Sequence, residues 1–189
     1  AGGQRARFVP AAGHPGPGGF SFTVTDSDGS SLTRLMNLFF ARQPQPDRLV
    51  WRGDALANAW TAAGDPNWFD GYSLLFSFRQ GVAVLFDDSG FSTPDVALAG
   101  ALNPASVSVE AAKNYTLAGP GSLAGTMALN KAGIGVFRLD NTNTYTGATA
   151  IDAGTLAVNG SGTSSVTIGS SGPLIGTGNI TGTVTNKGN

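Results

Sequence analysis

Short runs of apolar and polar residues recur along most of the chain, with the period of β-strands. Residues 20–25 alternate apolar and polar positions strictly, as a half-buried strand does. After Gly81, β-like runs follow one another at intervals of about ten residues, which is typical of a sandwich, a barrel or a β-solenoid. The predicted strands are residues 82–86, 96–98, 106–109, 115–117, 126–129, 136–139, 148–151, 155–158, 165–168 and 180–184.

The C-terminal part of the chain favours the solenoid among these three folds. After Glu110 only six charged residues remain and the side chains become small. A solenoid stacks like residues on like, so that each turn buries its faces against the next. We therefore predict an all-β fold whose main body is a parallel, β-helix-like solenoid. The aromatic-rich stretch 51–78 would cap its first turn, whose edge is otherwise exposed.

The first 42 residues have a different pattern. Strand candidates at residues 5–9, 20–25 and 31–40 surround a loop rich in Gly and Pro at residues 11–19. Asp26-Ser27-Asp28-Gly29 predicts a hairpin turn, because Asp-Gly accepts a positive φ. Three strands are too few to close a core, so we expect the end of a sandwich domain. The predicted units are residues 1–42 (sandwich strands), 43–47 (Pro-rich linker) and 48–189 (solenoid).

The composition limits the chemistry open to the chain. Its 189 residues include no cysteine, which excludes disulfides and thiol catalysis. The net charge of −1 provides no basic field for nucleic acid. No apolar run is long enough to insert into a membrane. The sequence opens with neither a signal peptide nor an initiator Met, and we expect it to be processed or excised from a longer product.

Two neighbouring stretches carry a family signature. Residues 129–139 read LNKAGIGVFRL, and residues 143–156 read NTYTGATAIDAGTL. Together they resemble the autotransporter-associated (passenger-associated) β-strand repeat, L-x-K-x-G-x-G-x-x-x-L followed by N-x-Y-T-G-x-T-x-I-x-x-G-T-L. Phe137-Arg138 departs from that repeat, which usually has smaller residues there. A looser likeness to the regions around such repeats extends over residues 49–185.

A second resemblance concerns the N-terminal unit. The string from Val9 to Gly13, followed by Phe20 to Asp26, is similar to the last strands of a bacterial Ig- or cadherin-like tandem domain. Both resemblances imply a modular exported bacterial protein, extracellular or on the cell surface, with no cofactor and no catalytic residue. They imply that its partners are the rest of the parent polypeptide or neighbouring subunits. We expect a continuing chain or a partner to cover the last solenoid turn.

Aromatic residues supply the candidate binding site. Trp51, Trp60, Trp68 and Tyr72 are close in sequence, and aromatic faces bind the apolar faces of sugar rings. On this interpretation the chain is a carbohydrate-contacting accessory region of a secreted polysaccharide-degrading enzyme, with glycans as partners. On the other, the same rings plug the end of the solenoid and the chain is a non-catalytic structural spacer. We favour the spacer.

Carboxylates supply a candidate for catalysis. Asp87, Asp88 and Asp95 could provide a paired-carboxylate site for glycoside cleavage. Such a site also needs a base or a metal cluster with a cation beside it. Arg79 is the nearest cation in sequence, and the single histidine, His14, belongs to the other unit. We therefore interpret the three as solvated turn residues and expect no enzyme.

Two further motifs have ordinary explanations. Asp26, Ser27 and Asp28 offer oxygen ligands that suit Ca²⁺, but their spacing is that of a hairpin turn. Arg52-Gly53-Asp54 spells an integrin-binding tripeptide, and three-residue matches arise often by chance. We expect no metal site.

Overall fold

The computed structural model describes residues 16–25, 27–40, 46–54, 57–62, 64, 66–70, 75–90 and 95–188. The chain divides into two compact units, Ala1–Gln45 and Pro46–Asn189. Within the described ranges, every regular element is a strand. No helix long and apolar enough to span a membrane occurs in that part of the chain.

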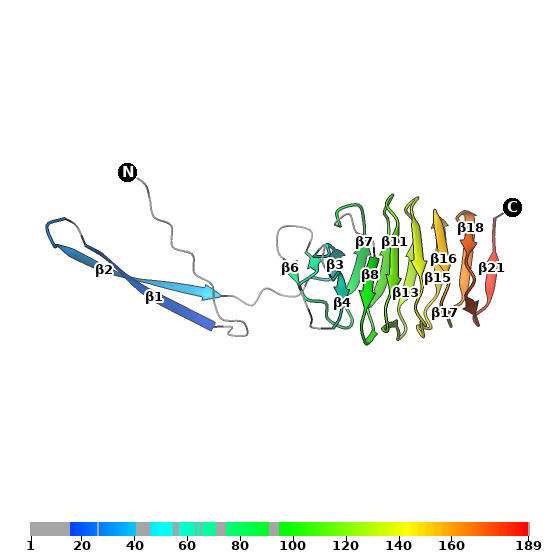
Figure 1. Cartoon of the computed structure of the whole chain (residues 1–189), viewed down its shortest axis with the longest axis horizontal. Helices are drawn as coiled ribbons and strands as arrows, with labels where there is room; N and C mark the ends of the chain where they lie inside the picture. The colour runs from blue at the N-terminus through cyan, green and yellow to red at the C-terminus, as the bar shows by residue number, and fades with distance from the viewer. Residues whose placement is uncertain are drawn as a thin grey trace. The chain divides into compact units, whose positions relative to one another are not determined.

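The described part of the first unit is an antiparallel hairpin of β1 (Gly16–Thr25) and β2 (Ser31–Phe40) (Figure 1). Gly29 in its turn has a φ of +82°, as the Asp-Gly pair predicted. The hydroxyls of Thr23 and Thr33 meet across the strands at 2.7 Å. These residues form a hairpin and no sandwich, so the Ig-like prediction is not confirmed. The predicted strand at residues 5–9 lies outside the described residues.

The start of β1 differs from the prediction of a loop at residues 11–19. Gly16, Pro17, Gly18 and Gly19 are paired with β2, from Phe40 to Asn37. Both strands of a two-stranded hairpin are edge strands, and an edge strand tolerates proline because its missing N–H faces away from the partner. The prediction was therefore wrong for residues 16–19.

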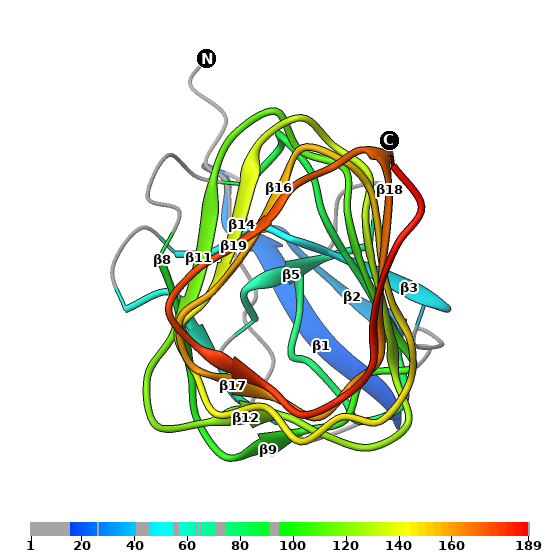
Figure 2. The ribbon, with the colours of Figure 1, turned by 90° about the vertical axis from the view of Figure 1, so that its right-hand side faces the viewer.

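The second unit is a parallel β-solenoid of about five turns. Viewed along its axis in Figure 2, the turns superimpose on one another, and Figure 1 shows their strands stacked side by side. One face is formed by β3 (Arg48–Trp51), β5 (Trp68–Phe69), β6 (Leu75–Phe76), β7 (Ala83–Phe86), β10 (Ser106–Val109), β13 (Ala128–Lys131), β15 (Thr149–Ala153), β18 (Val166–Ser171) and β21 (Val184–Asn186). The second face is formed by β4 (Ala59–Trp60), β8 (Asp95–Leu98), β11 (Tyr115–Ala118), β14 (Val136–Leu139), β16 (Thr155–Val158) and β19 (Leu174–Ile175). The third carries β9 (Ala101–Leu102), β12 (Ser122–Leu123), β17 (Ser161–Gly162) and β20 (Asn179–Ile180).

Strand pairing decides between the solenoid and the sandwich. From β7 onward, each strand of the first face pairs in parallel with its equivalent in the next turn. The register places one inward residue of each turn in a column: Leu49, Val84, Val107, Leu129, Thr149, Val166 and Val184. From Val84 on, members of this column are 23, 22, 20, 17 and 18 residues apart, so the later turns are shorter. The predicted parallel solenoid is confirmed.

Two glycines of one turn show how tightly successive turns approach. A Cβ on Gly160 would lie 2.0 Å from the carbonyl oxygen of Asn141 in the preceding turn. Gly162 instead borders a small cavity in the lumen, together with Tyr145 and Ile180. A Cβ added at Gly162 would meet nothing within 4 Å. Neither glycine has a positive φ, so the two differ in available space.

This contrast predicts opposite effects of two neighbouring substitutions. Gly162→Ala should raise the free energy of unfolding by about 0.5–1 kcal/mol, because alanine restricts the unfolded chain and its methyl group enters open space. Gly160→Ala should lower it by about 1–3 kcal/mol, because the methyl group forces two turns apart. Urea denaturation of both variants measures the difference. Equal effects would show that the close approach at Gly160 does not constrain stacking.

Candidate functional site

The aromatic stretch closes the N-terminal end of the solenoid. β5 pairs antiparallel with β3 and β6 pairs antiparallel with β5, so the parallel sheet ends in strands of alternating direction. Figure 1 places these strands at the N-terminal end of the solenoid, and Figure 2 shows β5 crossing the ring of the turns. Trp51 and Trp68 are partners in this pairing. The antiparallel strands thus cover both the first edge of the parallel sheet and the N-terminal opening of the solenoid lumen.

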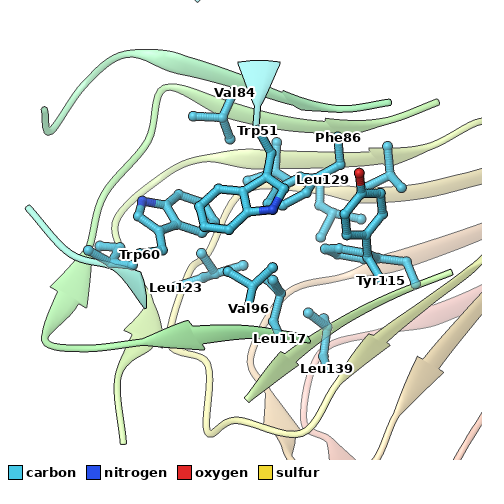
Figure 3. Packing of buried hydrophobic residues seen from close by; sticks show 14 of the residues in the cluster. Trp51, Trp60, Val84, Phe86, Val96, Tyr115, Leu117, Leu123, Leu129 and Leu139 are labelled. Carbon is cyan, nitrogen blue, oxygen red and sulfur yellow. The ribbon is translucent and has the colours of Figure 1, made fainter. Parts of the chain in front are cut away.

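The three indoles pack against one another inside this cap. Trp51, Trp60 and Trp68 are 1%, 0% and 1% exposed. Trp68 contacts Trp51 edge to face with ring centroids 5.0 Å apart, and Trp60 at 4.8 Å. Phe86 of the next turn lies within 5.9 Å of all three rings. It also contacts Tyr115 one turn further on, at 5.1 Å (Figure 3). The cluster is therefore continuous with the solenoid core.

This burial bears directly on the predicted sugar site. A pyranose ring stacks on an open aromatic face, and none of the three indoles has one in this arrangement. Tyr72, the fourth candidate, lies outside the described residues. Sugar binding by this stretch stays a prediction, while the three tryptophans have a structural role in the cap.

Two of the candidate carboxylates follow β7 directly, where Asp87 makes local hydrogen bonds and Asp88 bonds to the next turn of the solenoid. Asp87 accepts from the backbone N–H and the hydroxyl of Ser89. Asp88 accepts from the N–H groups of Ala112 and Lys113, both at 2.9 Å, in the next turn. These bonds hold the pKa of Asp88 below its usual value.

Asp95, the third carboxylate, begins β8 and is exposed. The described residues contain no group of three or more His, Cys, Asp or Glu side chains that could hold a metal ion. His14 and Asp26, two residues of the other candidate sites, lie outside the described ranges.

The Arg52-Gly53-Asp54 tripeptide is held within the cap. Arg52 donates from Nη1 to the carbonyl oxygen of Ser89 at 2.8 Å. Asp54 accepts from the backbone N–H of Asn58 at 2.8 Å, and the Asn58 side chain accepts from Asp54 N–H at 3.1 Å. Both charged side chains of the tripeptide therefore bond within the fold.

Sequence reasoning missed a polar interior between the later turns. The hydroxyls of Tyr145 and Thr149 meet at 2.8 Å, and those of Thr149 and Ser164 at 2.6 Å. All three residues are buried, and burial raises the pKa of Tyr145. Lys131 is also buried, two positions after the inward Leu129. The strict alternation of β-strands was the signal that could have placed this lysine inside.

Comparison with known protein families gives a match to the same stretch of chain. Residues 129–158 match the passenger-associated-transport-repeat. The repeat covers the chain from β13 to β16, and it includes Lys131, Tyr145 and Thr149. The match confirms the resemblance to an autotransporter passenger repeat and is consistent with an exported structural region. No curated protein and no solved structure matches the chain.

Substitution of Trp60 tests the cap. Trp60→Ala should lower the free energy of unfolding by about 3–5 kcal/mol, because it leaves a large cavity among aromatic rings. Trp60→Phe should cost much less, since it keeps a ring and removes a buried indole N–H for which the described part of the chain offers no hydrogen-bond partner. Chemical denaturation measures both. An alanine variant as stable as the parent chain would contradict the cap.

Asp88 gives the solenoid a defined acid sensitivity. Its folded-state pKa is lowered, so its stabilising effect is present above the unfolded pKa and is lost as the pH falls below about 4. Asp88→Asn cannot titrate. The parent chain should therefore lose more stability than Asp88→Asn between about pH 6 and pH 3, as urea midpoints would record. Parallel losses would mean that the two backbone bonds do not depend on the charge.

Proposed function

We propose that the chain is a non-catalytic spacer in a large exported bacterial protein, at the cell surface or in the secreted product. The observation that carries the proposal is the continuous stacking of parallel turns, closed at one end by a buried aromatic cap. The match of residues 129–158 to the passenger-associated-transport-repeat supports export. The bonds of Asp87 and Asp88 favour a structural role over a catalytic one.

A solenoid suits this role because its length is set by the number of turns. Neighbouring strands lie about 4.8 Å apart in the direction of their hydrogen bonds, which here join successive turns. Each turn contacts its neighbours alone, so stability accumulates as turns are added. The described later turns carry few charged residues, which is compatible with a mainly mechanical role.

The spacing can be measured because the chain has no native cysteine. Ser108 and Thr185 share one outward column, four turn-to-turn steps apart through Asn130, Ala150 and Thr167. Spin labels on Ser108→Cys and Thr185→Cys should therefore lie about 19 Å apart at the backbone. Duplicating residues 166–183 should lengthen this distance by about 5 Å. Pulsed electron–electron double resonance measures both distances. An unchanged mean distance or a broadened distance distribution after the duplication would contradict additive spacing.

The alternative function is contact with carbohydrate in a polysaccharide-degrading enzyme, and burial of the three indoles weakens it. A glycan array and a reducing-sugar assay on the whole chain separate the two. We expect neither binding nor release of sugar. Binding that Tyr72→Ala abolishes, with an unchanged circular dichroism spectrum, would replace the spacer by the carbohydrate module. Release of sugar that Asp95→Asn abolishes would make the chain an enzyme.

A further inference from the structure

Lys131 occupies a position that holds an apolar residue in the preceding turn and in the following one. In the register of the first face it lies between Val109 of the preceding turn and Ile151 of the following one. Its side chain is 0% exposed. Among the described residues no carboxylate pairs with it, and burial lowers its pKa. An ammonium group so placed is unfavourable unless the protein supplies other hydrogen-bond acceptors.

Backbone carbonyl groups supply these acceptors. The ammonium donates to the carbonyl oxygen of Gly133 in its own turn, and to that of Ala153 in the following turn at 3.2 Å. The second bond joins two turns at a corner, because Lys131 is the last residue of β13 and Ala153 is the last residue of β15. The lysine therefore connects successive turns through its charged end and packs its stem in the lumen.

Gly154 leaves room for this arrangement. A Cβ on Gly154 would lie 2.5 Å from Lys131 Nζ, 2.2 Å from Gly133 O and 2.7 Å from Gly135 O. Its φ is +63°, which also favours glycine. The ammonium and the carbonyl oxygens of two glycines thus gather around one point, which any larger residue would fill.

We propose that this corner is a carbonyl-lined cation site, occupied by the ammonium of Lys131, that locks the turn of β13 to the turn of β15. The K-x-G-x-G and G-T-L elements of the matched repeat are then parts of one site. Lys131 is the cation, Gly133 and Ala153 supply the carbonyl oxygens that accept from it, and Gly154 keeps the space open. With the lysine side chain removed, the site should take a small primary ammonium ion. The lock goes beyond the spacer function and does not depend on it.

Lys131→Met tests the charge, because methionine fills a similar volume without an ammonium group. Hydrogen exchange of the whole chain should then quicken at least tenfold in β15 and β16, while β7 and β10 keep their protection. Lys113→Met is the matched control, since Lys113 donates to a single carbonyl oxygen, that of Gly90 at 2.5 Å, and is less buried. It should leave β15 and β16 unchanged. Unchanged exchange in Lys131→Met would show that Lys131 only fills space and would overturn the lock.

Chemical rescue of Lys131→Ala tests the site itself. Propylammonium chloride should raise the melting temperature of this variant with saturation, and should not do so for the parent chain. Sodium chloride at equal ionic strength and neutral propanol should have no such effect. If Lys131→Ala does not fold without an additive, the yield of refolded protein in the presence of each additive is compared in place of the melting temperature. Absence of rescue by propylammonium, or equal rescue by propanol, would overturn the cation site.

Discussion

The parallel backbone ladder between successive turns is the interaction on which the rest of this structure depends. On the first face it runs from β3 to β21, with one shift of register between β15 and β18, and on the second from β4 to β19. Because the ladder joins equivalent residues of consecutive turns, it brings like side chains together in the lumen. The apolar column through Val84, Val107 and Leu129 follows from this register. Any residue on such a column must therefore suit the residues above and below it.

At the corners, where the chain turns from one face to the next, backbone bonds such as that from Gly135 N–H to Ala111 O still join successive turns. Side chains of a neighbouring turn supplement these backbone bonds. Asn114 accepts from Val136 N–H at 2.8 Å, and Asn143 accepts from Leu123 N–H at 2.9 Å. Asp88 acts in the same way toward Ala112. Lys131 works in the opposite sense, by donating to a carbonyl oxygen. Polar side chains thus complete the hydrogen bonding that parallel strands leave open.

The N-terminal end imposes a different constraint, because a parallel sheet cannot close its own edge. The chain reverses direction there, and β5 and β6 pair antiparallel at the boundary. Three indoles fill the lumen under these strands, where the column of smaller side chains begins. This arrangement carries a cost at Trp60, whose indole N–H is buried with no hydrogen-bond partner among the described residues. The same burial withdraws three of the four candidate sugar-binding residues from the surface.

Alternation of apolar and polar residues determined the strands, and the small, weakly charged tail with its repeat signature determined that they form a solenoid. The strands predicted at residues 106–109, 136–139 and 155–158 have the observed bounds, because their side-chain period is local and independent of partners. Only the tertiary structure decided which faces are covered. From the sequence alone, a tryptophan is equally consistent with a buried core and with a sugar-binding surface. A lysine is expected in solvent unless the fold surrounds it with carbonyl groups. Pairing of β1 over residues 16–19 likewise depended on a partner strand, which a Gly- and Pro-rich sequence does not reveal by itself.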